Sequence, residues 1–158
     1  MQAPTLQRAV DLQETVKAVL AQKGHATWSI SPDASVFDAI ATMSEKHVGA
    51  LVVLSGGRLV GVITERDYAR KVILKGRQSR ETKVREIMSA PVLYVTPSQT
   101  IGECMHLMTS RQIRHLPVLE ADRVTGIVSI GDLVNWIVTA QDDTIRQLHN
   151  YITGSYPG

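Results

Sequence analysis

The stretch from Leu59 to Asp67, L-V-G-V-I-T-E-R-D, decides the fold, because the chain uses its pattern twice. The second copy runs from Val124 to Asp132 as V-T-G-I-V-S-I-G-D, 65 positions further on. In each copy an apolar strand with one glycine leads into a hydroxyl residue, and an aspartate follows three residues later. This pattern predicts a strand that turns into the start of a helix, where backbone N–H groups and a carboxylate meet a small polar ligand. We expect the function to lie there.

The similarity between the two halves extends well beyond these stretches. Residues 31–72 align with residues 96–137 without a gap. The identical positions are Pro32/Pro97, Met43/Met108, Leu51/Leu116, Val53/Val118, Leu54/Leu119, Arg58/Arg123, Gly61/Gly126 and Asp67/Asp132. The apolar stripe of the helix expected at 34–46 recurs in the second half, so the expected burial pattern repeats as well as the residue identities. Upstream, residues 16–20 match residues 84–88, at a separation of 68.

Each half is expected to contain a helical turn, a short strand, a helix, a β-hairpin and a second helix. The fold class is therefore α+β (mixed α/β), with two repeats that are each a small sheet with flanking helices. They should pack about a pseudo-twofold axis, because so small a unit buries little surface alone. The expected divisions are an N-terminal segment at 1–15, repeats at 16–79 and 84–141, and a C-terminal helical tail at 142–158. Residues 75–83 lack apolar side chains and predict a linker, and the first strand is expected at 26–30.

Composition excludes several classes of protein. A hydrophobic content of 44% is normal for a packed globular chain. The apolar runs are too short to span a bilayer and the first residues lack a signal-peptide pattern, so cytoplasmic residence is expected, with no membrane partner. A net charge of +2 does not suggest a nucleic-acid binder. The single cysteine, Cys104, has no pattern of metal ligands around it, so no metal site is indicated. No nucleophile and base lie at a spacing typical of an active site, so no enzyme is indicated.

The doubled pattern resembles the cystathionine-β-synthase (CBS) domain, present as a tandem pair that is also called a Bateman module. The second half carries the resemblance best, in Arg114-His115-Leu116-Pro117-Val118 and in Ser129-Ile130-Gly131-Asp132-Leu133. In the first half Gly49-Ala50-Leu51-Val52-Val53 replaces the R-H-L-P-V segment. The resemblance covers Val16 to about Ala140, so the chain is similar to a free-standing CBS pair.

This resemblance implies a regulatory, signal-transducing module that binds an adenosine compound, such as AMP, ADP, ATP, NAD or S-adenosylmethionine, in clefts between its repeats, with no catalytic cofactor. A carboxylate suits the two hydroxyls of a ribose, because its two oxygens accept both hydrogen bonds. The implied ribose ligands are Thr64, Asp67, Ser129 and Asp132. The implied adenine neighbours are Trp28, Ile30, Leu93 and Val95. The implied phosphate contacts are Arg66, Arg114 and His115. We expect Asp67 and Asp132 to hold one ribose each, and Arg66 and Arg114 to make the two sites unequal.

Two alternatives remain open. The Thr64/Asp67 and Ser129/Asp132 pairs fit helix N-caps equally well, a role that needs no ligand. The protein is then a structural homodimerisation scaffold without a physiological nucleotide. A homodimer is expected in both cases, since the last helix leaves apolar surface, and CBS pairs usually dimerise. The apolar residues concerned are Leu133, Val134, Ile137 and Val138, with Ile145, Leu148 and Ile152 on one face of the tail. The sequence does not identify the protein that this module would regulate.

Overall fold

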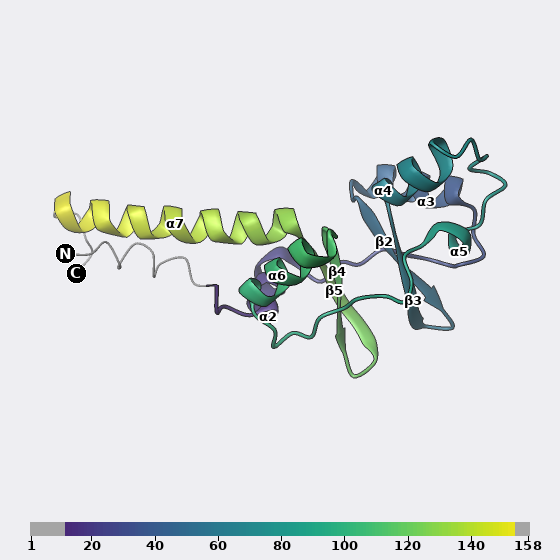
Figure 1. Ribbon diagram of the computed structural model, residues 1–158. Helices are drawn as coiled ribbons and strands as arrows, with labels where there is room; N and C mark the ends of the chain where they lie inside the picture. Colours follow the sequence, from purple (N-terminus) through teal and green to yellow (C-terminus); the bar gives the residue numbers. More distant parts are fainter. Residues whose placement is uncertain (1–11, 154–158) are drawn as a thin grey trace.

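Two lobes, each a small sheet with helices packed against it, follow one another along the chain in the computed structural model, which describes residues 12–153 (Figure 1). Up to the loop that joins the lobes, the elements are α2 (Val16–Lys23), β1 (Ser29–Ile30), α3 (Val36–Lys46), β2 (Ala50–Ser55), β3 (Arg58–Thr64), α4 (Glu65–Tyr68), the π-helical turn η1 (Ala69–Ile73) and α5 (Val84–Ile87). They are followed by α6 (Ile101–Arg111), β4 (His115–Glu120), β5 (Arg123–Ser129) and α7 (Ile130–Thr153). Helix α7 extends far beyond the second lobe. The predicted α+β class is confirmed.

The two hairpins have the same register. In the first, β2 and β3 are antiparallel and their pairing shifts after Val53; in the second, β4 and β5 shift after Val118. These two residues are 65 positions apart, the repeat distance seen in the sequence. Strand β1 adds a parallel pair to β2. In the second lobe the equivalent strand is reduced to a single parallel bridge between Val95 and Val118.

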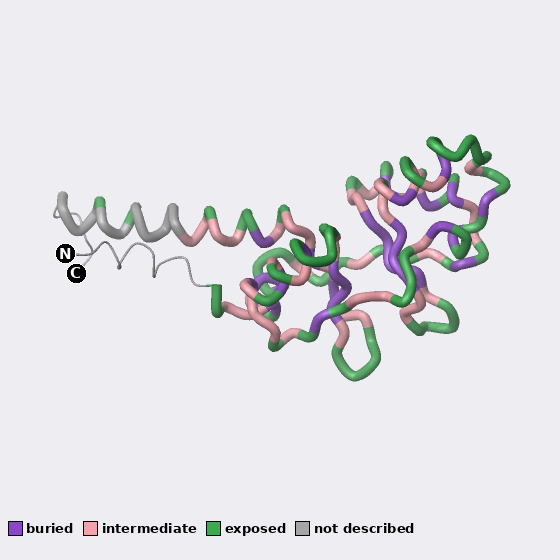
Figure 2. Tube along the Cα trace, in the orientation of Figure 1, coloured by how far each residue is buried: buried purple, intermediate pink, exposed green. Residues whose placement is uncertain are grey.

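Each lobe has its own apolar core. The first core contains Val36, Ala39, Met43, Leu51, Val53, Ile63, Val72, Val84 and Ile87. The second contains Val16, Val19, Leu20, Val95, Ile101, Cys104, Met108, Leu116, Val118, Val128 and Leu133. Figure 2 shows that the buried residues follow the strands and the helix sides that face them, while the hairpin turns are exposed. The predicted helix stripes are Val36, Ala39, Ile40 and Met43 in α3, and Ile101, Cys104, Met105 and Met108 in α6. Both stripes are confirmed, with Ile40 and Met105 only partly buried.

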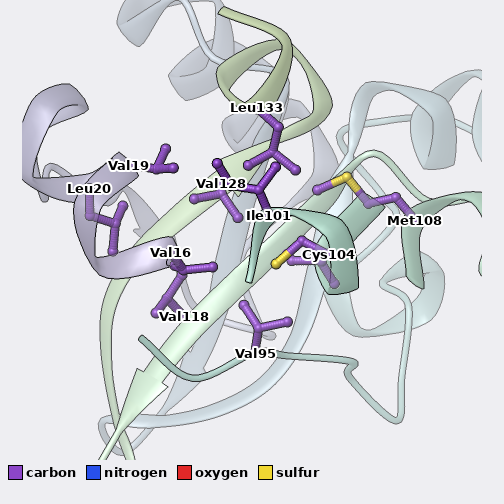
Figure 3. Packing of buried hydrophobic residues seen from close by; sticks show 11 residues of the cluster. Val16, Val19, Leu20, Val95, Ile101, Cys104, Met108, Val118, Val128 and Leu133 are labelled. Carbon is purple, nitrogen blue, oxygen red and sulfur yellow. The ribbon is translucent and has the colours of Figure 1, made fainter. Parts of the chain in front are cut away.

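The two lobes exchange their first helices. Helix α2 precedes the first lobe in sequence but packs in the second core, where Figure 3 shows its side chains beside Val118 and Val128. Helix α5 precedes the second lobe and packs in the first core. The contacts are equivalent, because Leu20 lies on Gly126 of β5 and Met88 lies on Gly61 of β3. The predicted domain boundaries stay a prediction, but the packing units do not follow the order of the chain.

The first lobe differs from the sequence expectation in its first strand. The strand expected at 26–30 is ordered as a strand only at Ser29–Ile30. At the end of the π-helical turn η1, Val72 is 1% exposed and Ile73 is 57% exposed. The segment expected to be a linker, 75–83, is mostly exposed, apart from Thr82, which is 3% exposed. The carbonyl oxygens of Ser79 and Thr82 accept hydrogen bonds from the first N–H groups of α3, so this segment also caps that helix.

Helix α7 is amphipathic where it meets the second lobe. Leu133 is fully buried, and Trp136 and Ile137 pack against the same core. Val134 and Val138 are 46% and 47% exposed. The side chains of Ile145, Leu148 and Ile152, expected on one face, lie outside the described residues. Among the described helices, none is both long and apolar enough to cross a membrane.

Candidate functional site

Thr64 and Asp67 form a complete capping box at the junction of β3 and α4. The Thr64 hydroxyl accepts a hydrogen bond from the Asp67 N–H at 3.1 Å, and Asp67 Oδ2 accepts from the Thr64 N–H at 3.0 Å. The capping role left open by the sequence is therefore present. The helix cap uses mainly the Oδ2 atom of Asp67, since the Thr64 hydroxyl also donates to this oxygen at 3.1 Å.

The other carboxylate oxygen of Asp67 faces a lysine and a serine. Lys71 Nζ lies 3.1 Å from Asp67 Oδ1 and also donates to the Ile87 carbonyl oxygen at 2.8 Å. The Ser89 hydroxyl donates to the same Oδ1 across 3.4 Å, which is long for a hydrogen bond. Asp67 is 8% exposed, and the ammonium of Lys71 beside Oδ1 balances its charge.

Asp67 lines a cleft of about 540 Å³ between the two lobes. Its residues come from the end of β3 and the helix after it, from the loop that follows α5, and from the start of β4. They are Gly49, Val62, Thr64, Glu65, Arg66, Asp67, Arg70, Lys71, Ser89, Pro91, Val92, Leu93, Gln112, Ile113, Arg114 and His115. Four of these side chains are cationic and two are anionic. The cleft therefore has an excess of positive charge, which favours an anionic ligand.

The structure brings six of the predicted site residues together in this one cleft: Thr64, Arg66, Asp67, Leu93, Arg114 and His115. Ser129, Asp132 and the remaining adenine neighbours do not line it. Trp28 is 40% exposed and has the Lys46 ammonium 4.4 Å from its ring centroid. Ile30 packs against the first core and Val95 is fully buried in the second, so Val95 has no surface to offer a ligand.

Arg66 and Arg114 lie at the same site. The sequence suggested that they distinguish two sites, but both line the cleft at Asp67, one from each lobe. Arg66 Nη1 also donates to the Gln112 carbonyl oxygen at 3.3 Å, which links the lobes directly. The two guanidinium groups therefore make one strongly basic wall, and this wall belongs to the cleft at Asp67.

His115, the first residue of β4, lines the cleft opposite Gly49 of the first lobe. A Cβ atom at Gly49 would come 3.4 Å from His115 Nε2 and 3.0 Å from Glu65 Oε1, so glycine leaves room for the imidazole. Burial lowers the pKa of His115, and the cations Lys23 and Arg114 lower it further against the opposing effect of Asp132. The lowered pKa favours the neutral imidazole, which can offer one donor and one acceptor to a ligand.

The second Asp site has the same cap and a different neighbour. Asp132 Oδ2 accepts from the Ser129 N–H at 2.8 Å, and the Ser129 hydroxyl accepts from the Asp132 N–H at 3.1 Å. Lys23 Nζ then lies 2.5 Å from the same Oδ2 and 2.5 Å from the Ile127 carbonyl oxygen. At this second site, therefore, the ammonium group of a lysine from α2 contacts the carboxylate of Asp132.

Several residues near the two aspartates were not predicted from the sequence. Lys71 and Arg70 follow Asp67 by four and three residues, a helical spacing that could have identified them. Ser89 follows α5, and Lys23 is the last residue of α2. The sequence does not show which lobe each of these short helices packs on, so no local signal marks the two residues. Within the described residues, no group of three or more His, Cys, Asp or Glu side chains could hold a metal ion.

Comparison with known proteins assigns the family. The model of the CBS domain matches residues 26–73 and 84–139. The CBS domain-containing protein CBSX3, mitochondrial, of Arabidopsis thaliana is 40% identical over 152 residues, which cover 90% of this chain and 73% of that protein. A solved structure of a protein with CBS domains from Burkholderia ambifaria MC40-6 is 47% identical, with a TM-score of 0.76 over 79% of this chain and 94% of that one.

A more distant solved structure shares the fold. It is the CBS domain pair of protein MJ0100 in complex with 5'-methylthioadenosine and S-adenosyl-L-methionine, 23% identical, with a TM-score of 0.71 over 79% of this chain and 96% of that one. The repeat, the exchanged helices and these matches agree. The chain belongs to the CBS domain family and contains a tandem pair of CBS domains.

Proposed function

We propose that the protein is a regulatory module that binds an anionic adenosine nucleotide, AMP, ADP, ATP or NAD, in the cleft at Asp67. One observation carries this proposal: a carboxylate suited to a ribose and an excess of cations line the same cleft of about 540 Å³. A nucleotide presents a ribose diol next to its phosphates, and this cleft offers a matching group for each.

The ribose would bind at Asp67 Oδ1. Its hydroxyl groups replace the long contact from Ser89 and compete with the Lys71 ammonium, while Oδ2 keeps its place in the helix cap. A released Lys71 stays next to the ligand and is available to a phosphate oxygen. Apolar contacts for the adenine come from Val62, Val92, Leu93 and Ile113.

The phosphates would bind at the basic wall of Arg66 and Arg114, with Arg70 beside it in the cleft. Guanidinium groups offer paired donors to phosphate oxygens, and the wall has residues from both lobes. A bound phosphate would therefore compete with the Gln112 carbonyl oxygen for Arg66 and change the contact between the lobes. The ligand regulates only if it binds one arrangement of the lobes better than another.

The complex of protein MJ0100 with two adenosine compounds supports the adenosine class, on the basis of a shared fold alone. The excess of cations in this cleft distinguishes among such compounds. S-adenosylmethionine has a positive sulfonium next to its ribose, which Arg66, Arg70 and Arg114 would repel. Nucleotides have phosphates at that place, which the same residues attract.

Calorimetric titration of the purified protein with AMP, ADP, ATP, NAD and S-adenosylmethionine tests this proposal. We expect binding of at least one nucleotide, weaker binding of S-adenosylmethionine, and no turnover. Asp67→Asn should weaken binding at least about tenfold, because the neutral amide loses charge-assisted hydrogen bonds. Asp38→Asn, an exposed acid in the first turn of α3, is the matched control. If no nucleotide binds, the alternative of a structural scaffold is supported instead.

The proposal includes a homodimer formed through α7. Val134 and Val138 are exposed on the part of this helix that adjoins the second lobe, next to residues buried in the core. A second copy that presents the same face would bury both valines. The regulated partner is a further protein that the sequence does not identify, and residence in the cytoplasm stays a prediction from the sequence.

A further inference from the structure

We propose that His115 takes up a proton when a nucleotide binds in the cleft at Asp67, so that the module responds to pH as well as to the nucleotide. This inference rests on the proposed function and goes beyond it, because it assigns a second signal to the same site. The proton comes from the solvent, and it returns to the solvent when the nucleotide leaves.

The imidazole of His115 lies between the two lobes. His115 begins β4, and its pairing with Ser129 of β5 holds its backbone in the second lobe. Gly49 of the first lobe lies opposite, where an added Cβ atom would come 3.4 Å from His115 Nε2 and 3.5 Å from Cε1. Because His115 also lines the cleft, its ring is close to the space in which the nucleotide would bind.

Charged groups from both lobes face this imidazole. Glu65 Oε1 of the first lobe lies 3.0 Å from the position of the added Cβ atom at Gly49. The other charged side chains of the first lobe that line the cleft are Arg66, Asp67, Arg70 and Lys71. From the second lobe, burial lowers the pKa of His115, Asp132 raises it, and Lys23 and Arg114 lower it further. In the free protein these surroundings disfavour the imidazolium form.

A bound phosphate reverses this balance. The basic wall of Arg66 and Arg114 is the place proposed for the phosphates, and Arg114 precedes His115 directly in the chain. A negative charge within about 4–6 Å of an imidazole favours its protonated form. The same phosphate also offsets the charge of Arg114, one of the two cations that oppose protonation. Imidazolium has two N–H donors, so protonation adds a donor for a phosphate oxygen.

Removal of water by the ligand is the opposing effect. A nucleotide in the cleft takes some water from the ring, and desolvation disfavours the charged form. The side chain of His115 is already partly buried in the free protein, so a ligand adds only the remaining part of this cost. The phosphate, in contrast, adds a full negative charge that the free cleft does not have. The electrostatic effect of the phosphate is therefore the larger of the two.

The first repeat does not supply an equivalent imidazole. The alignment of the repeats places Ala50 opposite His115 and Gly49 opposite Arg114. Ala50 is 6% exposed and has no group that could bind a proton. The second lobe thus contributes the titrating side chain to a cleft whose ribose carboxylate, Asp67, belongs to the first lobe. The response to pH therefore depends on the contact between the lobes.

Linkage fixes the direction of the pH dependence. The nucleotide-bound protein has the higher His115 pKa, so the affinity rises as the pH falls through that pKa and levels off below the pKa of the free protein. The coupling is reciprocal, because the factor by which protonation tightens nucleotide binding is the factor by which the nucleotide tightens proton binding. Mild acidification would therefore increase occupancy of the cleft at a fixed nucleotide concentration.

Proton uptake per bound nucleotide tests this inference. It is measured by titration calorimetry with AMP, ADP, ATP and NAD between pH 8 and 6, in pairs of buffers with different ionisation enthalpies. We expect the wild type to take up as much as about one proton more than His115→Gln, and to bind about tenfold more tightly at pH 6 than at pH 8. NAD is the most informative ligand, because its phosphates are diesters and do not titrate near pH 6 as a phosphate monoester does.

His106→Gln is the matched control. His106 is an exposed imidazole of α6 that does not line the cleft, so this variant should keep the wild-type proton uptake. His115→Asn repeats the test if the glutamine variant unfolds at a lower temperature. Nuclear magnetic resonance of the imidazole C–H groups gives an independent measurement, in which the titration midpoint of His115 should move to higher pH when the nucleotide is added.

The outcomes separate this inference from the proposed function. Equal proton uptake in the wild type and in both His115 variants, or an unchanged midpoint of His115 on binding, overturns the inference and leaves nucleotide binding in place. Loss of the uptake in His106→Gln would assign the proton to another imidazole and also overturns it. No binding of any of the four nucleotides to the wild type overturns the proposed function itself.

Discussion

Leu20 of α2 lies so close to Gly126 of β5 that a Cβ atom at Gly126 would come within 2.9 Å of both Leu20 Cδ atoms. The equivalent pair in the other lobe is Met88 and Gly61, where a Cβ atom would come 2.7 Å from the Met88 sulfur. In each lobe the glycine of the second hairpin strand is therefore the place where the exchanged helix docks.

This contact predicts coupled effects on stability. Leu20→Ala should lower the free energy of unfolding by about 2–5 kcal/mol, because Leu20 is almost completely buried. Gly126→Ala should lower it by about 1–3 kcal/mol through overpacking. The double variant should lose less than the sum, since the smaller side chain at position 20 makes room for the new methyl group. Urea unfolding measures all three, and additive losses would show that the contact is absent.

Gly131→Ala is the control for these variants. A Cβ atom at Gly131 meets nothing closer than the Ser129 hydroxyl at 3.5 Å, which is an ordinary contact distance. The free energy of unfolding should therefore change by no more than about 0.5 kcal/mol.

The basic wall of the cleft predicts selectivity for phosphate. Arg114→Gln should reduce the affinity for ATP by about tenfold or more, because a charge-assisted hydrogen bond contributes about 1.5–3 kcal/mol. The affinity for adenosine, which has no phosphate, should change little. Calorimetry with both ligands measures the difference, and Arg111→Gln serves as control because Arg111 does not line the cleft. Equal losses for ATP and adenosine would contradict a phosphate contact.

His115 predicts a loss of stability in mild acid. Burial lowers the pKa of folded His115 below its ordinary value of 6.5, so the unfolded chain binds more protons between these two values. The free energy of unfolding therefore falls as the pH drops below about 6.5, and the loss is complete below the folded pKa. Thermal unfolding from pH 7.5 to 5 should show a shallower decrease for His115→Gln. His106→Gln, at an exposed position, should retain the wild-type slope.

Cys104 predicts a thiol that does not react in the folded protein. Burial, together with the charge of Glu103, raises the pKa of this thiol to about 11. A thiol-specific colour reagent at pH 8 should therefore leave the native protein unmodified and react with one thiol per chain in denaturant. Rapid modification of the native protein would mean that the second core opens far more often than its packing indicates.

The exposed face of α7 predicts a dimer that charge can disrupt. Val134→Asp and Val138→Asp should shift the mass measured by light scattering from two chains toward one, because a carboxylate is costly to bury in an apolar interface. Asn135→Asp introduces the same charge at a neighbouring exposed position and should leave the mass unchanged. Unchanged mass in both valine variants would place the contact between copies elsewhere.

The sequence was sufficient for the elements and for their repetition. Apolar strand runs, helix stripes and the Thr64 and Ser129 caps are local patterns, and local patterns repeat whenever the structure repeats. The sequence did not predict how the cleft is assembled. Apolar residues at 16–20 and 84–88 indicate that each of these helices has a buried side, but this pattern does not show in which core the helix packs. The exchange of these helices places Ser89 at Asp67 and Lys23 at Asp132, contacts that span 22 and 109 positions.

The same limitation explains the assignment of the arginines. Arg66 and Arg114 belong to different repeats and have no equivalent in the other half, since Gly131 and Gly49 occupy those positions. Sequence comparison therefore treats them as the marks of two different sites. A pseudo-twofold axis between the lobes instead brings non-equivalent residues together, which only the spatial arrangement reveals.

The exchange of first helices also fixes an order of events during protein synthesis. Helix α5 follows the first lobe directly, so that lobe has every part of its core as soon as residue 87 has emerged from the ribosome. Helix α2 is made before the first lobe, yet its covering strands begin at His115 and its core includes Leu133. The apolar side of α2 therefore has no covering core until the second hairpin and the start of α7 have been made.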